Sequence, residues 1–108
     1  MNGWVLKEDG GRLNEHILNT KIVSNQRGFA GQKVRVHGQV VKVNEAIMDR
    51  NWIHLVDGSA DDYDFVITSN VSVPVGHAVV FEGLISTNRD FGAGYKYELL
   101  MEDAVTIK

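Results

Sequence analysis

The sequence of 108 residues has no cysteine, one proline and no surplus of basic side chains. Without cysteine it contains no disulfide framework, no thiol nucleophile and no zinc site built on cysteine. No apolar run approaches the roughly 20 residues that a transmembrane helix needs. The 11 Lys and Arg residues are outnumbered by 14 Asp and Glu residues, which gives a net charge of -3. Because non-specific affinity for nucleic acids comes from neutralising phosphates, this charge excludes a strongly basic nucleic-acid binder.

The rest of the composition is typical of one globular domain, with 44% hydrophobic and 23% charged residues. Residues 1–6 carry no charged leader and no apolar core long enough for a signal peptide. An exported protein from which the signal has been removed has the same appearance. The expected location is therefore the periplasm or cell envelope for a trimmed exported chain, and otherwise the cytoplasm.

The chain divides into an N-terminal extension, residues 1–30, and a domain, residues 31–108, which differ in pattern. In the extension, Leu13, Ile17 and Leu18 have helical spacing, so residues 12–20 are expected to form a short helix in an otherwise weakly structured segment. From residue 32 onward, Val, Ile, Thr and aromatic residues form runs separated by clusters of Gly, Asn and Asp. This pattern is typical of β-strands.

Five strands are predicted, at residues 33–44, 51–57, 63–69, 78–87 and 95–107. In the first strand, Val36 and Val40 share one side-chain parity, whereas Val41 and Val43 share the other. A period of two cannot change phase without an irregularity. We therefore expect a bulge or a sharp bend near Gly38, where glycine makes one least costly.

Alternation along the second strand places Ile53 and Leu55 inside the fold and Trp52 and His54 outside it. Five strands, of which the first is long and bent, favour a small closed barrel, because a sandwich usually needs about seven strands. The sequence thus predicts an all-β fold, a five-stranded Greek-key barrel of the OB type.

Several segments are similar to known OB-fold sequences. Residues 31–41, GQKVRVHGQVV, match the opening pattern GxxVxVxGxV of many OB-folds. More particular are VKVN at 41–44, IM at 47–48, NWIHL at 51–55 with DG at 57–58, VPVG at 73–76 and DFGAGY at 90–95. Through these motifs, residues 31–108 resemble a bacterial family of small OB-fold proteins. The resemblance implies an OB barrel from a family known mainly as nucleic-acid-binding or uncharacterised proteins, many of them exported or lipid-anchored.

The usual binding face of an OB barrel is formed by strands two and three and flanked by two loops. Those loops correspond here to residues 44–50 and 88–94. The candidate ligand-binding residues around them are Lys42, Arg50, Trp52, His54, Arg89, Phe91 and Tyr95, with Lys96 and Tyr97 nearby. Cations beside aromatic rings suit a single strand, whose phosphates follow the cations and whose bases stack on the rings. Lys42, Arg50 and Arg89 are expected to position phosphates, and Trp52 and Phe91 to stack on bases.

The same residues also have purely structural interpretations. Tyr95 and Tyr97 share parity with the apolar residues that follow them, so in the alternative their rings plug the barrel. Trp52 lies outside the barrel, where the N-terminal segment would cover it. Gly92 and Gly94 are predicted to be turn residues with positive φ and not a phosphate cradle, because a phosphate loop precedes a helix and a strand follows here.

No set of residues has the spacing of a catalytic or metal site. The acidic residues at 57, 61, 62 and 64 lack EF-hand spacing and are interpreted as a solvated loop. His37 and His54, on neighbouring predicted strands, are interpreted as exposed cross-strand residues and not as metal ligands. No serine lies in a nucleophile-elbow setting. We therefore predict a protein that is not an enzyme and that has no metal and no cofactor.

The sequence predicts a non-enzymatic binding module that holds a short single-stranded nucleic acid weakly, with an affinity that falls steeply with salt. The alternative is an accessory domain of the cell envelope that uses the same barrel to bind a protein or another non-nucleic-acid partner. OB barrels serve unrelated functions, so the fold itself does not choose. The acidic charge balance and the export habit of the resembling family favour this alternative.

Overall fold

The computed structural model describes residues 17–59 and 63–107. They form two short helices and then five strands: α1 (Asn19–Ser24), α2 (Gln26–Phe29), β1 (Lys33–Ile47), β2 (Arg50–Val56), β3 (Phe65–Ser69), β4 (Ala78–Asp90) and β5 (Lys96–Ile107). The prediction of a mostly β, five-stranded domain is confirmed. β1 and β4 extend beyond their predicted ends because their last residues still pair, Ile47 with Arg50 and Asp90 with Lys96.

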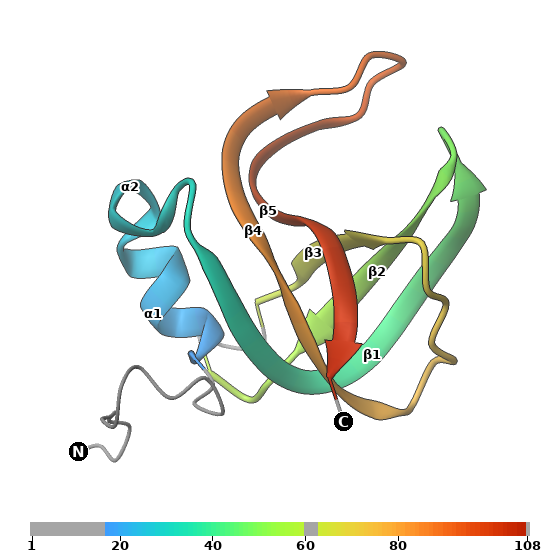
Figure 1. Cartoon of the computed structure of the whole chain (residues 1–108), viewed down its shortest axis with the longest axis horizontal. Helices are drawn as coiled ribbons and strands as arrows, with labels where there is room; N and C mark the ends of the chain where they lie inside the picture. Colours follow the sequence, from blue (N-terminus) through green and yellow to red (C-terminus); the bar gives the residue numbers. More distant parts are fainter. Residues whose placement is uncertain (1–16, 60–62, 108) are drawn as a thin grey trace.

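The five strands form one sheet that closes into a ring in the order β1-β2-β3-β5-β4 (Figure 1). β1 closes the ring, because its residues 33–39 pair with β4 and its residues 39–47 pair with β2. These pairs are antiparallel, whereas β3 and β5 are parallel neighbours with Ile67 opposite Met101. The ring therefore has an interior that side chains fill and an outer surface on which other side chains pack.

A bulge in β1 reverses its side-chain phase as it passes from one neighbour to the other. The register with β2 shifts between residues 40 and 42. Val40, before the shift, is fully buried, whereas Val41 is 44% exposed. Val43 then packs against the core again. The phase change expected from the sequence is present, but it lies at Val41 and not at Gly38.

Gly38 has a different structural role. A Cβ atom at this position would collide with the carbonyl oxygen of Val56, which belongs to the backbone of β2 and has little freedom to move. Glycine therefore allows β1 and β2 to approach each other closely where β1 changes partners.

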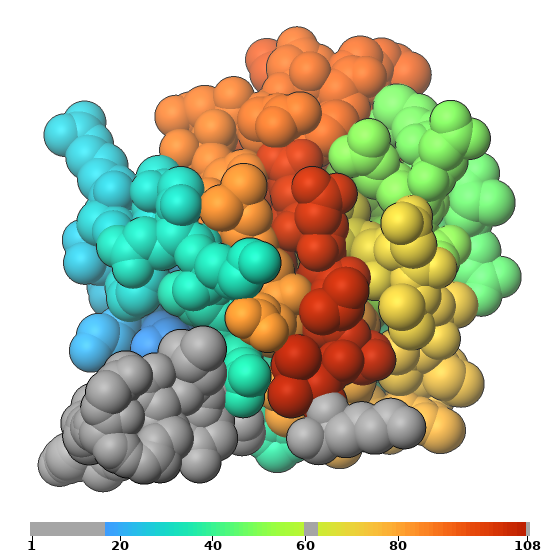
Figure 2. Space-filling view, viewed as in Figure 1, coloured from blue at the N-terminus to red at the C-terminus, as the bar shows by residue number. Residues whose placement is uncertain are grey.

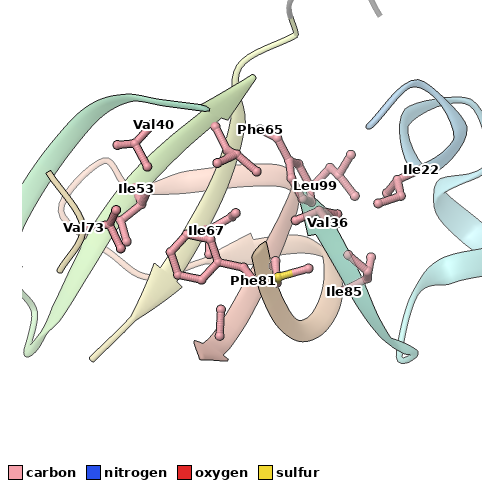
Figure 3. Packing of buried hydrophobic residues seen from close by; sticks show 13 residues of the cluster. Ile22, Val36, Val40, Ile53, Phe65, Ile67, Val73, Phe81, Ile85 and Leu99 are labelled. Carbon is pink, nitrogen blue, oxygen red and sulfur yellow. The ribbon is translucent and has the colours of Figure 1, made fainter. Parts of the chain in front are cut away.

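The interior of the ring is filled by apolar side chains from all five strands and from α1 (Figure 3). Phe65 and Phe81 are fully buried there. Ile53 and Leu55 also belong to this interior cluster, in agreement with the alternation predicted for the second strand. Ile22 of α1 joins the same cluster, so the helix packs on the sheet through an apolar side chain.

In the described part of the extension, the first helix begins near the end of the predicted one. Of the expected helix at 12–20, residues 12–16 lie outside the described residues, and α1 starts at Asn19. The N–H of Ile17 donates to the Arg35 carbonyl of β1 at 2.8 Å, and the N–H of Asn19 donates to the Asp57 carboxylate at 2.8 Å. These tertiary contacts set the start of the helix, which lies with α2 at one side of the molecule (Figure 2). Neither helix is long and apolar enough to cross a membrane.

Candidate functional site

Residues predicted from two separate loops meet on the outer side of β2. Arg50 and Trp52 of β2 lie beside Phe91 of the β4–β5 hairpin, and the Phe91 ring also contacts Arg89 of β4. Trp52 packs in addition on Tyr95. With Tyr97 and Glu102 of β5 they form what we call the arginine–aromatic cluster, which comprises Arg50, Trp52, Arg89, Phe91, Tyr95, Tyr97 and Glu102. Its apolar members form a hydrophobic cluster separate from the one inside the ring.

The hairpin reaches this position because it extends beyond the ring. β1 pairs with β4 no further than Leu84, whereas β4 and β5 continue to pair as far as Asp90 and Lys96. The tip closes with a hydrogen bond of 2.8 Å from the Phe91 N–H to the Tyr95 carbonyl. Gly92 and Gly94 both have φ of 86°, so the prediction that they are positive-φ turn residues is confirmed.

Trp52 lies outside the ring interior, as predicted, but only 1% of its surface is exposed. Its ring centroid is 5.2 Å from that of Phe91, 5.3 Å from that of Tyr95 and 5.4 Å from that of Tyr97. Its indole N–H donates to the Ile47 carbonyl at 2.9 Å. Trp52 therefore presents no free face on which a base can stack, and the contacts that cover it come from the hairpin.

Tyr95 and Tyr97 do not plug the interior of the ring, which corrects the structural alternative. Both rings pack on Trp52 in the outer cluster, and Tyr97 is nearly parallel to it, with 24° between the planes. Their parity along β5 placed them in the interior. That inference fails because alternation distinguishes the inside of the ring from the outside only where the strand lies within the closed sheet. Past Leu99, whose side chain still lies in the interior cluster, the hairpin has no partner in β1 or β3, so this alternation no longer applies to Tyr97 and Tyr95.

Two guanidinium groups lie beside the Phe91 ring. The Cζ atom of Arg89 is 4.7 Å from the ring centroid, and that of Arg50 is 5.2 Å from it. Both distances are within the range of cation–π attraction. The Arg50 side chain is 33% exposed and the Arg89 side chain 47%, so both side chains are partly open to solvent although their guanidinium groups lie beside the ring.

Glu102 is the anion shared by the two arginines. Its Oε2 accepts a hydrogen bond from Arg89 Nη1 at 2.8 Å, and its Oε1 lies 3.9 Å from Arg50 Nη1. Only 8% of the Glu102 side chain is exposed. The sequence-based site missed this residue. A carboxylate inside the apolar run Leu99-Leu100-Met101 and Ala104 of β5 was the available signal, because a buried charge needs a partner.

Lys42 of β1 is paired with His54 of β2, four residues along β2 from Arg50. Lys42 is exposed. His54 instead contacts a carboxylate, because its Nδ1 lies 2.8 Å from both oxygens of Asp64. His37 pairs with Val80 of β4, so the two histidines are not cross-strand neighbours as their predicted strands suggested.

Two tyrosines near this surface have raised pKa values. Burial raises the pKa of Tyr63 above its usual value near 10, and the charges of Glu98 and Asp64 raise it further. Burial also raises the pKa of Tyr97, with smaller contributions from Tyr95 and Asp64. Both phenols are therefore neutral at physiological pH and present O–H groups beside carboxylates.

The acidic loop is divided by its contacts. Asp61 and Asp62 lie outside the described residues. Asp57 accepts the N–H groups of Asn19 and Ser59, and Asp64 pairs with His54. Within residues 17–59 and 63–107, no group of three His, Cys, Asp or Glu side chains is arranged to hold a metal ion.

A shallow groove of about 320 Å³ runs along the hairpin beside the cluster. It is lined by Asn88, Arg89, Asp90, Lys96, Tyr97 and Glu98. Its two cations and two carboxylates balance, so the groove adds hydrogen-bonding groups to the surface but no net charge.

Protein-family models and curated proteins give no match to this chain.

Proposed function

We propose that this chain is an OB-type barrel that binds an extended single-stranded nucleic acid through the arginine–aromatic cluster. The strand order β1-β2-β3-β5-β4 and a long, bent β1 shared by both ends of the sheet support the OB assignment. The cluster occupies the outer side of β2 between the β1–β2 turn and the β4–β5 hairpin, which is the place where OB barrels usually bind oligomers.

One observation carries the proposal, namely the two partly exposed arginine side chains whose guanidinium groups lie beside the Phe91 ring. An arginine held by an aromatic ring has a planar face or a free N–H edge to offer, and it suits both phosphates and the flat faces of bases. In this arrangement Arg50 and Arg89 contact the bound nucleic-acid strand directly. Trp52 acts beneath them as support for the hairpin, because its ring is already covered.

The test is an amide-shift NMR titration with oligo-dT and oligo-U at low and at roughly physiological salt. We expect shifts concentrated at residues 42, 50–54 and 88–97 that shrink as salt rises, because the contacts are to phosphates. Arg89→Gln should weaken binding several-fold. Arg27→Gln is the matched control, since Arg27 is an exposed arginine of α2, which lies apart from the hairpin tip (Figure 1).

The absence of shifts at millimolar oligonucleotide would discard this function. A second candidate, binding of a protein partner, would then stand, and it has its own supporting observation. Val71 and Val75 of the β3–β4 loop are 37% and 60% exposed. They lie at or beside a groove of about 430 Å³ whose apolar lining includes Val43, Val73 and Pro74. An apolar side chain of a partner suits this groove better than a phosphate does.

A further inference from the structure

Glu102 occupies the position between Arg50 and Arg89 in which an anionic ligand would be held. Each of its carboxylate oxygens faces a different guanidinium, at 2.8 Å for Arg89 and 3.9 Å for Arg50. The carboxylate cancels one of the two positive charges, so the three side chains together carry a charge of +1. At 8% exposure, it is not a solvated surface group that salt can screen freely.

A carboxylate and a phosphodiester compete for the same guanidinium donors, because both accept paired N–H groups in a planar geometry. Arg50 is constrained further, since its Nε donates to the Met48 carbonyl at 3.3 Å. The Nη1 group of each arginine faces the Glu102 carboxylate, so the two guanidinium groups converge there. A phosphate that is to bridge both arginines must therefore displace Glu102 or accept the remaining, outward donors.

We propose that Glu102 is an internal competitor for phosphate that limits the affinity of the cluster for single-stranded nucleic acid. The inference rests on the function proposed above and assigns one residue as the determinant of its weakness and of its salt dependence. It predicts that removing an anionic side chain from a buried position strengthens binding. That direction is opposite to the effect expected from disturbing a merely structural residue.

The test compares Glu102→Gln with Asp103→Asn by fluorescence anisotropy of labelled oligo-dT across a salt series. Both variants remove one negative charge from adjacent positions of β5. Asp103 is exposed, and its φ of 54° is a value that asparagine tolerates. Glu102→Gln should bind about tenfold more tightly at low salt, equivalent to about 1.4 kcal/mol. The slope of log affinity against log salt should steepen by about 0.7 for each additional phosphate contacted. Asp103→Asn should change the affinity less than about twofold.

Two further variants keep the proposal open to refutation if Glu102→Gln folds poorly. Glu102→Leu removes the charge without leaving an amide to be satisfied in a buried site. In the Arg89→Gln background, Glu102→Gln should lose most of its gain, because the stronger partner of the carboxylate is gone. Folding of each variant is checked by Trp52 emission in a Trp4→Phe background, which leaves a single tryptophan.

The outcomes separate the two proposals. If neither the wild type nor Glu102→Gln binds oligonucleotide, the proposed function itself fails. If the wild type binds and folded Glu102 variants match Asp103→Asn, the function stands and the competitor role is refuted. Weaker binding by Glu102→Gln would also refute it, because Glu102 would then position the arginines and not compete with the ligand.

Discussion

Replacing Trp52 by alanine tests whether the outer cluster is a packed core or an open binding face. The side chain is 1% exposed, and its indole N–H donates to the Ile47 carbonyl at 2.9 Å. Removing a buried tryptophan costs about 3–5 kcal/mol, because the transfer of the ring is lost and a cavity remains. A tryptophan that served as an exposed platform would cost far less to remove. We expect Trp52→Ala to lower the free energy of unfolding by about 4 kcal/mol.

Two opposing effects place the value within that range. Trp52 pairs with three aromatic rings at 5.2 to 5.4 Å, and each such pair adds about 0.5–1.5 kcal/mol beyond the area that it buries. Against this, Phe91 and Tyr95 are only half-buried and sit on a hairpin that extends beyond the ring, so they are free to collapse into part of the cavity. The milder Trp52→Phe keeps an aromatic ring but removes the indole donor, and it should cost about 1–2 kcal/mol.

The assay is urea unfolding followed by far-UV circular dichroism, which does not depend on tryptophan emission. With a slope of about 2 kcal/mol per molar urea, a loss of about 4 kcal/mol moves the midpoint by about 2 M. Val75→Ala is the control, because Val75 is 60% exposed and should change stability by less than about 0.5 kcal/mol. A loss below about 1 kcal/mol for Trp52→Ala would refute the packed cluster.

Three further changes probe other parts of the structure. Gly38→Ala should destabilise the protein by about 2 kcal/mol or more in the same assay, because the new Cβ meets the Val56 backbone oxygen; an unchanged midpoint would contradict the close approach. Asp57→Ala should cost about 1–3 kcal/mol and loosen α1, seen as faster amide exchange at Asn19, because the N–H of Asn19 loses its acceptor. The raised pKa of Tyr63 favours the neutral phenol in the folded state, so its contribution is complete below pH 10 and is lost as pH rises through the higher folded pKa. Tyr63→Phe should therefore reduce the alkaline loss of stability, measured by unfolding between about pH 9 and 12, and an identical loss in the variant would contradict this assignment.

The strands were predictable because their signals are local. Alternation of Val, Ile and aromatic residues marks each strand wherever the closed sheet imposes a period of two. The phase change in β1 was visible for the same reason, since Val40 and Val43 both need to face inward from opposite parities. The predicted position of the bulge was wrong because a bulge does not require glycine. Val41 is the extra residue of the bulge, and its side chain is exposed. Gly38 is required by the close approach of β2, and the local sequence pattern contains no information about that approach.

The residues that make up the candidate site were easier to predict from the sequence than the role of each residue in it. Two loops placed Arg50, Trp52, Arg89 and Phe91 near one another, and the structure brings these four together. Their chemistry was not predictable, because it depends on which surface each side chain still has free. The same composition of cations and rings describes an open stacking platform or a packed cluster whose charge is partly cancelled. Only the contacts distinguish the two.

By itself, then, the sequence determined the all-β class, the five strands and the two loops that flank β2, because periodicity and turn chemistry act between residues close along the chain. The tertiary structure alone decided that Trp52 is covered and that Arg50 and Arg89 share Glu102. Those outcomes depend on where the end of the β4–β5 hairpin, which extends beyond its β1 partner, packs on β2. That position is set by burial and charge pairing, mostly between residues about 40 to 50 positions apart.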